Sequence, residues 1–532
     1  MRRIPATMAT QHPDSATTYV PVQKEAEEAM KVLMPTKKGG FGIDEYMIDF
    51  EGKMTPYVQT SEVVVGLVSK GLIPGKDVFI TPRIPSVSQE TVFRQLMALM
   101  SIMEAYYRIH EESAEPSILE VIHPMSKSAQ ELIDTRKRIL DVIDLTNREF
   151  NISVDRQVIH IIPLVEEVPE LISIKKLLTE YLSGCKDLGL SDGPLRVMLG
   201  RSDAALDYGH LPSALTNKLA ISDCYTYGSE YNVTVAPIMG AGSLPFRGHV
   251  TLENVDSLLN DFGGLKTVTI QSSLIYDRDR QSTVKLIKRI SDDLQKTKPV
   301  IYSAEQRDEV LKLVGIFTKN YLKTFYLIID SIKAMSDFFP NQRDRLARKG
   351  AIGYARDVPR PAYLASCVRD KKLSRELRRL QVTDTLPDLP RAIKYTGALY
   401  SIGLPPEFIG TGRGSKEADD RGLLNVLLTE YYPGLRGDLN FSQQFLNLEV
   451  ARDFMPYTAF KQVQQDVKYV FEYLALNERE QNITYCTLME TIKPTLKQLI
   501  STGERMLIDE VTQMGLIESC ILKLGTIRGA LG

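Results

Sequence analysis

Eight short runs that favour β-strand recur along the first half of the chain at intervals of 32 to 41 residues. Between them lie segments in which apolar residues repeat at three- and four-residue steps, as in an amphipathic helix. Short strands that alternate with helices in this way predict an α/β fold, a (β/α)8 TIM-type barrel around a parallel sheet. The predicted strands are 5–9, 46–50, 78–80, 118–122, 158–162, 196–199, 233–236 and 267–270.

After residue 275 the strand-like runs nearly vanish and helical periodicity replaces them. A chain of 532 residues would allow two to four domains at roughly 100–200 residues each. We predict one catalytic unit in two layers. A barrel over 1–275 carries most of the active site, and an α-helical region over 276–532 packs on it, completes the site and supplies an oligomer interface. The apolar stripe predicted within 305–339 consists of Val310, Leu313, Val314, Phe317, Tyr321, Leu322, Phe325, Ile328, Ile329 and Ile332.

The overall charge and the cysteines exclude several classes of protein. With 65 Lys and Arg against 67 Asp and Glu, the net charge is -2, so the sequence offers no electrostatic case for a nucleic-acid or membrane-surface protein. The five cysteines include no CxxC pair, which argues against a zinc site or a disulfide framework. No run of 18 apolar residues occurs, and the first residues do not resemble a secretory signal. We therefore predict a cytoplasmic protein with reduced thiols.

Two carboxylates follow neighbouring strands of the predicted barrel, where the active site of this fold lies. Glu166 follows the fifth predicted strand and Asp203 follows the sixth. Carboxylate oxygens are the ligands that Mg²⁺ or Mn²⁺ prefers, so the pair is a candidate metal site. The alternative is that each carboxylate pairs with a nearby arginine or lysine.

Arginines also gather at the predicted mouth of the barrel. Their planar guanidinium groups suit phosphate and carboxylate, so together with a divalent metal they imply a small, multiply charged anionic substrate. No Walker motif or GxGxxG is present to suggest ATP or NAD, and the glycine run 410–414 is a weak signal alone. The basic segment 341–361 is either a solvated surface or a shaped loop that meets an anion. The candidate arginines are Arg83, Arg201, Arg247, Arg356, Arg391, Arg413 and Arg528.

One histidine follows the first predicted strand. His12 stands between Gln11 and Pro13 and could act as a general base near neutral pH. A lone histidine is often structural, so from the residues alone both roles stay open.

Together these segments resemble archaeal-type phosphoenolpyruvate carboxylase, and the resemblance runs in order along nearly the whole chain. No single motif is specific, but their order and placement are. Pro245 stands where longer members of the family carry a histidine, and His249 is a candidate replacement. The segments that carry the resemblance are Thr10-Gln11-His12-Pro13-Asp14, Arg83, 163–166, 198–203, Phe246-Arg247-Gly248, 353–356, Arg391-Ala392-Ile393, Gly410-Thr411-Gly412 and 527–532.

The resemblance implies that the protein converts phosphoenolpyruvate and bicarbonate to oxaloacetate and phosphate, through carboxyphosphate and enolpyruvate. It implies catalytic roles for His12, Arg83, Arg247 and Arg391, substrate binding by Arg201, Arg356, Arg528 and Lys461, and binding of Mg²⁺ or Mn²⁺ by Glu166 and Asp203. Biotin is not expected, because no A-M-K-M carrier motif is present. A homotetramer, and feedback inhibition by aspartate or malate at the basic segment or Arg413, are also implied.

Two other functions stay open from the sequence. Another metal-dependent barrel lyase or aldolase that acts on a 2-oxo acid would use the same carboxylates, metal and arginines. A non-catalytic scaffold that binds an anionic metabolite would need the cations but no general base.

Overall fold

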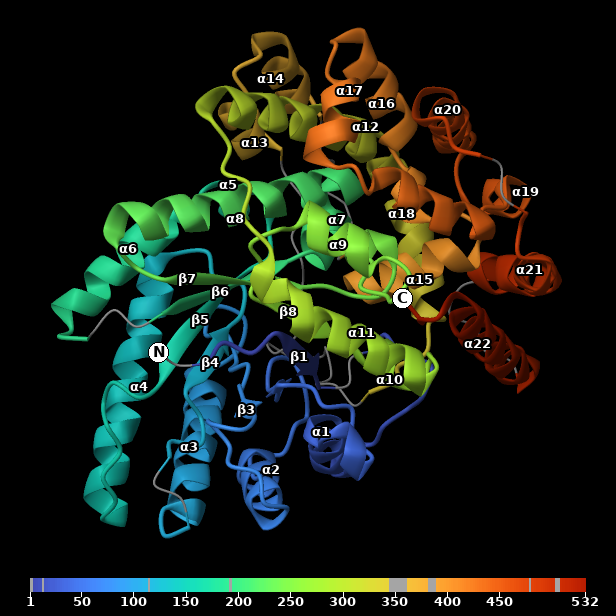
Figure 1. Ribbon diagram of the computed structural model, residues 1–532. Helices are drawn as coiled ribbons and strands as arrows, with labels where there is room; N and C mark the ends of the chain where they lie inside the picture. The colour runs from blue at the N-terminus through green and yellow to red at the C-terminus, as the bar shows by residue number, and fades with distance from the viewer. Residues whose placement is uncertain are drawn as a thin grey trace.

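The computed structural model describes residues 3–11, 14–112, 115–190, 194–343, 361–380, 389–477, 480–502 and 508–532. All eight predicted strands are present and pair in parallel in the order β3-β2-β1-β8-β7-β6-β5-β4, which confirms the barrel (Figure 1). The strands are β1 (Thr7–Thr10), β2 (Glu45–Met47), β3 (Phe79–Ile80), β4 (Glu120–His123), β5 (His160–Val165), β6 (Leu195–Gly200), β7 (Val235–Gly240) and β8 (Thr267–Ile270).

The barrel closes between β3 and β4 through the residues that follow β3. Arg83 forms parallel bridges with both Asp49, beyond β2, and Ile122 in β4. Ile84 donates its backbone N–H to the Ile122 carbonyl at 3.1 Å, and Ile122 donates to Pro82 at 2.8 Å. The two ends of the strand order are therefore joined by backbone hydrogen bonds.

Side chains inside the barrel are stacked in three levels because alternate residues of a strand point to the same side. The series Glu45, Met47 and Asp49 shows this arrangement: the first is at the base, the second in the middle and the third at the mouth. The middle level is an apolar plug, which separates the base from the mouth. It consists of Met8, Met47, Ile122, Ile162, Leu164, Met198 and Ile238.

The base of the barrel holds a buried ion cluster, with one residue from each even-numbered strand. Arg196 in β6 donates to Glu45 in β2 at 2.7 Å and to Glu120 in β4 at 2.8 Å. It also donates to the Thr267 hydroxyl in β8 at 3.0 Å. The three charged side chains are almost completely buried, so the cluster depends on the arginine to balance two carboxylates.

Replacing Arg196 with methionine is expected to lower the free energy of unfolding by about 3–5 kcal/mol, because two carboxylates would stay buried without a partner. Urea unfolding of wild type and variant measures the loss. Arg289→Met is the matched control, since Arg289 pairs with Asp293 on the exposed surface, and no measurable loss is expected there. An Arg196→Met protein as stable as wild type would contradict this reading of the base.

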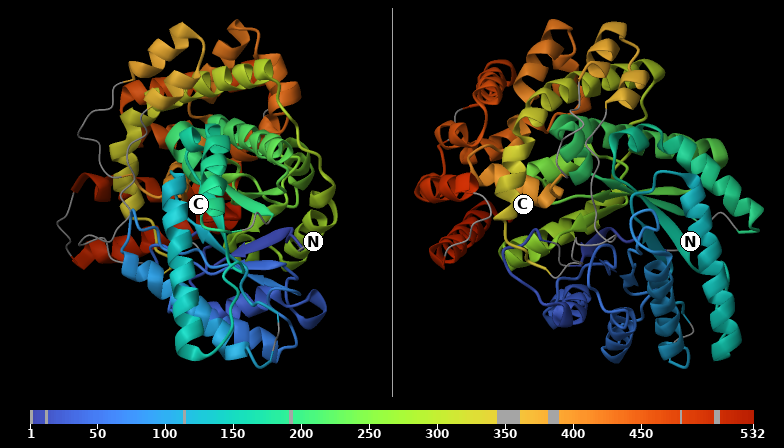
Figure 2. Two further views of the ribbon diagram at one scale, coloured as in Figure 1. Left: turned by 90° about the vertical axis from the view of Figure 1, so that its left-hand side faces the viewer. Right: turned by 180° about the vertical axis from the view of Figure 1, so that it is seen from behind.

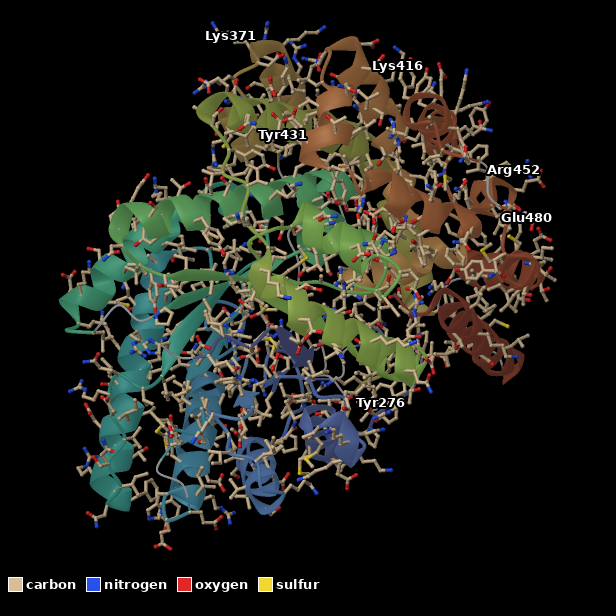
Figure 3. The ribbon with its side chains drawn as sticks, viewed as in Figure 1. Tyr276, Lys371, Lys416, Tyr431, Arg452 and Glu480 are labelled. Carbon is tan, nitrogen blue, oxygen red and sulfur yellow. The ribbon has the colours of Figure 1, made fainter. Side chains whose placement is uncertain are left out.

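Helices surround the barrel in chain order. The last of them, α11, contacts β1 and α9 and so belongs to the barrel, although it lies beyond residue 275. Tyr276, labelled in Figure 3, ends α10, and the helical region begins at α12. The barrel helices are α1 (Glu25–Leu33), α2 (Gln59–Ser69), α3 (Val92–Ile109), α4 (Ala129–Phe150), α5 (Val168–Ile172), α6 (Ile174–Asp187), α7 (Ser202–Tyr208), α8 (His210–Tyr231), α9 (Val255–Asp261), α10 (Ser272–Tyr276) and α11 (Arg280–Asp293).

The helical region covers one side and the top of the barrel in the views of Figures 1 and 2. Its longest member is α12 (Ala304–Asp337), a single helix whose ten predicted stripe residues are all buried. The first half of α12 shares a core with the barrel and the second half belongs to a separate core with α15 and α22, so α12 joins the two layers. The other helices are α13 (Ala362–Cys367), α14 (Lys371–Arg378), α15 (Ala392–Ser401), α16 (Thr411–Asp420), α17 (Leu424–Val426), α18 (Leu435–Ser442), α19 (Leu448–Ala451), α20 (Tyr457–Leu474), α21 (Ile483–Thr502) and α22 (Ile508–Arg528).

Candidate active site

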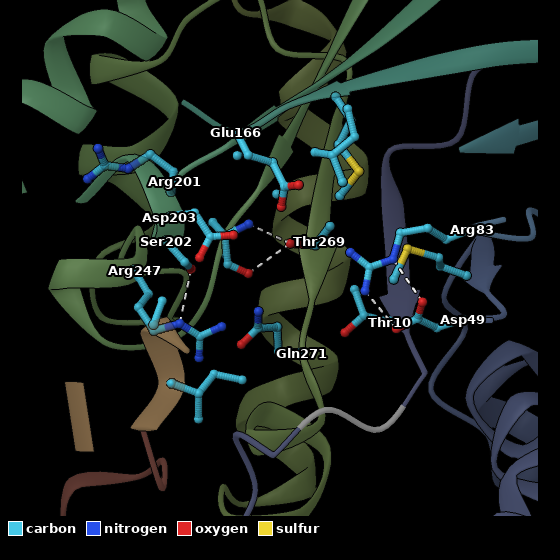
Figure 4. A pocket seen from close by; sticks show the side chains of 18 of the residues that line it. Thr10, Asp49, Arg83, Glu166, Arg201, Ser202, Asp203, Arg247, Thr269 and Gln271 are labelled. Atoms are coloured by element: carbon cyan, nitrogen blue, oxygen red, sulfur yellow. Dashed lines mark hydrogen bonds and ion pairs between the residues drawn. The ribbon is translucent and has the colours of Figure 1, made fainter. Parts of the chain in front are cut away.

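A cavity of about 170 Å³ lies at the carboxyl ends of the barrel strands (Figure 4). The barrel supplies most of its wall, because the inward-facing positions continue beyond the strand ends. Residues 391–393, at the start of α15, close it from the helical side. The charged and polar residues of the lining are Thr10, Gln11, Asp49, Glu51, Lys53, Arg83, Glu166, Arg201, Ser202, Asp203, Arg247, Thr269, Gln271 and Arg391.

The two predicted metal ligands are brought together in this cavity. Glu166 follows β5 and Asp203 is the second residue of α7, and Figure 4 shows both carboxylates directed into the same space. Glu166 accepts a hydrogen bond from the Met125 backbone at 3.2 Å. A side chain at position 200 would crowd Glu166, because a Cβ there would lie 3.1 Å from its Cγ. Among the described residues no group of three His, Cys, Asp or Glu side chains could hold a metal, so any cation here would need further ligands from substrate or water.

Arg83 lies on the opposite wall, held by two carboxylates. Its Nε and Nη2 bind both oxygens of Asp49 at 2.8 and 2.7 Å, and its Nη1 lies 2.9 Å from Glu51. Lys53 also contacts Asp49. Burial would raise the pKa of Asp49, but Arg83 and Lys53 outweigh it and hold that pKa well below its usual range. Asp49 therefore stays ionised, and ion pairs hold the opposed charges of this wall together.

Arg247 reaches the cavity from the loop after β7, in the short helix η3 (Pro245–Arg247). Its Nε donates to the Ser202 hydroxyl at 3.0 Å, and its Nη1 donates to an oxygen of Gly532 at 2.5 Å. Figure 4 shows the guanidinium between Ser202 and Gln271, on the same side of the cavity as Asp203. Burial lowers the pKa of Arg247 to about 10, against the opposite effect of Asp203, so the side chain stays positively charged at neutral pH.

The helical region holds the Arg247 loop at two more points. Glu407 accepts the Phe246 backbone N–H at 2.7 Å, and Asp438 in α18 lies 2.6 Å from Nδ1 of His249. His249 has a φ of 55°, a left-handed backbone that residues other than glycine rarely adopt. Asp438 also contacts His210 at 3.0 Å. Contacts from the helical region therefore fix the backbone on both sides of Arg247.

Comparison with known proteins was made for the whole chain. Residues 4–532 match the sequence profile of a family described as phosphoenolpyruvate carboxylase. A phosphoenolpyruvate carboxylase from Methanopyrus kandleri is 41% identical, with 100% of this chain and 99% of the relative covered. One from Methanosarcina barkeri is 42% identical, with 99% of each chain covered. This chain belongs to the phosphoenolpyruvate carboxylase family. The family predicted from the motifs is confirmed, and with it the assignment as a carboxy-lyase.

Solved structures offer a weaker comparison for this member of the phosphoenolpyruvate carboxylase family. Haloferax volcanii malate synthase, in a pyruvate and acetyl-CoA ternary complex, matches with a TM-score of 0.35 at 13% identity. The match covers 82% of this chain and 97% of the synthase. A TM-score this low carries no argument about the site.

The carboxylase cavity includes Arg83, Arg247, Arg391, Glu166 and Asp203, as predicted from the sequence. His12 and Arg356 lie outside the described residues. Their predicted roles, general base and substrate ligand, therefore stay predictions.

Three other residues predicted to bind substrate direct their cationic groups elsewhere, although Arg201 lines the cavity, and their role in substrate binding stays a prediction. Arg201 is buried with its guanidinium 5.8 Å from the Phe262 ring, and in Figure 4 it points away from the two carboxylates. Lys461 lies on the exposed face of α20, over the Tyr457 ring.

Arg528 is the third, and it is used inside the C-terminal turn. It donates to the Ala530 carbonyl at 2.9 Å and to the Tyr485 hydroxyl at 2.8 Å, and it also contacts the Leu531 carbonyl. Because this turn delivers the Gly532 oxygen to Arg247, Arg528 supports the site from a distance.

Two further sequence hypotheses are corrected by helix packing. Arg413 is not open to an inhibitor, because its donors bind Asp466, Gln462, Thr324 and the Asn320 carbonyl. The glycine run around it lets α16 approach its neighbours: a Cβ on residue 412 would lie 1.9 Å from the Asp466 carbonyl oxygen. His249 is absent from the cavity lining and does not replace the family histidine there.

Lining residues that the sequence analysis did not assign a role include Asp49, Lys53, Thr269 and Gln271. A signal for Asp49 was available. It is a carboxylate inside an apolar run, two and four residues beyond Met47 and Glu45, so alternation places all three on one face. Lys53 carries a weaker signal, its place shortly after the second predicted strand, on the side where the active site of a barrel lies.

Replacing Glu407 with glutamine is expected to change the pH dependence of stability. Burial raises the pKa of Glu407 to about 7, while hydrogen bonds from Tyr400 and Phe246 oppose it. A pKa raised by folding gives a stability contribution that is complete below the unfolded pKa near 4.5 and is lost as pH rises through about 7. Glutamine does not titrate, so the variant lacks this loss. Between pH 4.5 and pH 8 its free energy of unfolding should therefore rise by about 3 kcal/mol relative to that of wild type.

Unfolding by urea at both pH values measures the Glu407 effect. Glu62→Gln, on the exposed face of α2, is the matched control and should give the same difference from wild type at both pH values. A Glu407→Gln curve parallel to that of wild type would show that the carboxyl is not protonated on folding.

Proposed function

We propose that this chain carboxylates phosphoenolpyruvate with bicarbonate to give oxaloacetate and phosphate. The observation that carries the proposal is the pairing, in one cavity, of two converging carboxylates with cationic side chains from both layers of the molecule. The substrate is a three-carbon phosphate with up to three negative charges, and such an anion needs both a cation site and fixed guanidinium groups.

The arginines would bind and orient the substrate. Arg247 is held at Nε and Nη1 by Ser202 and Gly532, so its position is set before substrate arrives. A donor fixed in this way stabilises charge that develops on phosphate or enolate oxygens without reorganising during the reaction. Arg391 would contribute from the start of α15, and Arg83 from the opposite wall.

Glu166 and Asp203 would hold Mg²⁺ or Mn²⁺. Two carboxylates fit such an ion, which commonly takes one or two carboxylates and completes its shell with substrate oxygens and water. A bound divalent cation supplies neutralisation of phosphate and enolate charge. Asp203 also lies near enough to Arg247 to oppose the lowering of its pKa by burial, so the two side chains would act on adjacent parts of one ligand.

The reaction would begin with the formation of carboxyphosphate and end with the formation of the carbon–carbon bond. Bicarbonate oxygen attacks phosphorus, and the P–O bond to the enolate breaks to give carboxyphosphate and enolpyruvate. His12 would then take the carboxyl proton of carboxyphosphate, so that CO₂ and phosphate separate and the enolate carbon attacks CO₂. Biotin would have no part, since phosphate activates the bicarbonate.

A coupled assay tests the proposal. Purified chain, phosphoenolpyruvate, bicarbonate and Mg²⁺ or Mn²⁺ should oxidise NADH in the presence of malate dehydrogenase, and omission of bicarbonate should abolish the signal. A metal-dependent lyase acting on a 2-oxo acid would form no oxaloacetate from these substrates. A binding scaffold would show no turnover with either metal.

The resemblance also leads us to propose a cytoplasmic homotetramer inhibited by aspartate or malate. None of the described helices is long and apolar enough to cross a bilayer. A groove lined by Ile483, Leu488 and Ile527, between α21 and α22, is apolar in the way subunit contacts require. Light scattering tests the tetramer, and inhibition of the coupled assay tests the effectors.

A further inference from the structure

Arg343, the last described residue before position 361, is completely buried, although the sequence places it in a basic segment. Its Nη2 lies 2.7 and 2.8 Å from the two carboxylate oxygens of Glu25, and 3.1 Å from the Thr55 hydroxyl. Glu25 begins α1 and is also completely buried. The helical region thus reaches the first helix of the barrel through a buried ion pair.

This ion pair is connected to the cavity by a short chain of hydrogen bonds. Gln11 donates its amide N–H to Glu25 and accepts the Asp49 backbone N–H through its amide oxygen. Asp49 in turn holds Arg83 through two hydrogen bonds. Gln11, Asp49 and Arg83 all line the cavity, whereas Glu25 and Arg343 do not.

A second path runs through Thr55. Its hydroxyl accepts from Arg343 at 3.1 Å and donates to the Asp49 carbonyl at 2.6 Å. Asp49 is therefore fixed at its backbone N–H by Gln11 and at its carbonyl by Thr55, and both contacts lead back to Arg343 and Glu25.

Burying the Glu25–Arg343 ion pair costs free energy, which argues for a role other than stabilising the fold. Burial raises the pKa of Glu25 to about 7 even though Arg343 and Lys53 lower it. An ion pair in an interior is often no better for stability than apolar residues of the same size. Its directional contacts, by contrast, can fix the place of a neighbouring amide.

We propose that Glu25 and Arg343 are positioning residues for the carboxylation site. Their ion pair holds Gln11 against Asp49, so that the helical region sets the position of Arg83. The kinetic test of this inference rests on the proposed function, whereas its test by hydrogen–deuterium exchange rests on the geometry alone.

The kinetic test compares Glu25→Gln, Arg343→Met and the double variant. Arg343→Met is expected to lower kcat about 10- to 100-fold with a smaller change in KM, because a site displaced by about 1 Å loses rate on this scale. The kcat of the double variant should be no lower than that of the slower single variant, since each substitution removes the same ion pair. Arg343→Lys, which keeps the charge, should recover part of the loss.

Arg413→Met is the matched control. Arg413 also forms a buried ion pair, with Asp466 at 2.7 Å, but no partner of Arg413 lines the cavity. It should lose thermal stability with unchanged kcat and KM. Should Arg343→Met fail to fold, Glu25→Gln alone decides, because glutamine keeps the shape of the side chain. Wild-type kcat and KM in Glu25→Gln and Arg343→Lys would overturn the proposal.

Hydrogen–deuterium exchange separates this inference from the proposed function. Peptides that contain residues 7–11 and 45–53 should exchange faster in Glu25→Gln than in wild type. In Arg413→Met the same peptides should exchange at the wild-type rate. If wild type forms no oxaloacetate, the proposed function fails while exchange still decides the positioning role. Equal exchange in Glu25→Gln and wild type would overturn the positioning role.

Discussion

Replacing Asp203 with asparagine is expected to lower kcat/KM by about 10²–10³-fold, which corresponds to several kcal/mol of transition-state stabilisation. Asparagine keeps the size of the side chain but removes the charge that would bind the cation beside Glu166. The apparent activation constant for Mg²⁺ should rise in the coupled assay. Electron paramagnetic resonance of Mn²⁺ measures binding directly and does not depend on turnover.

Two further variants make the Asp203 result specific. Glu166→Gln should give a loss of the same order, because its carboxylate faces the same space (Figure 4). Asp256→Asn, on the exposed surface of α9, should bind Mn²⁺ as wild type does. If Asp203→Asn bound Mn²⁺ with unchanged affinity, the cation would have to lie elsewhere, and the arginines would carry the substrate alone.

The recurrence of strands made the barrel predictable, and with it the meeting of Glu166 and Asp203 at the mouth. The middle plug and the ion cluster at the base repeat the two-residue alternation of each strand, and Glu166 and Asp49 continue it at the mouth. The same rule accounts for the direction of the Arg201 side chain. Arg196, Met198 and Gly200 take the inward positions of β6, so the next residue turns outward, toward the helices behind the barrel.

Contacts of the helical region could not be derived in the same way. Arg413 and Arg528 carry the same charge and similar glycine-rich surroundings as the residues predicted to bind substrate. What distinguishes them is the set of acceptors brought in by other helices: Asp466 in α20 for the first, and Tyr485 in α21 for the second. These pairings join residues far apart in the chain and depend on packing that no local pattern encodes.

Replacing His12 with alanine is expected to lower kcat for oxaloacetate formation by about 10²–10⁴-fold, the usual range for loss of a general base. His12 follows Gln11, which is buried, lines the cavity and is fixed by Glu25 and Asp49. In the proposed sequence His12 acts only after carboxyphosphate has formed. The variant should therefore still cleave phosphoenolpyruvate in the presence of bicarbonate and release phosphate in excess of oxaloacetate.

Parallel assays of phosphate, pyruvate and oxaloacetate detect this uncoupling in the His12 variant. His110→Ala, in an exposed position at the end of α3, is the matched control and should release phosphate and oxaloacetate in equal amounts. If His12→Ala lost phosphate release and oxaloacetate together, His12 would act in the first step, on bicarbonate or on phosphorus. If it lost neither, another base would be needed, and His249 could not supply it because Asp438 holds it outside the cavity.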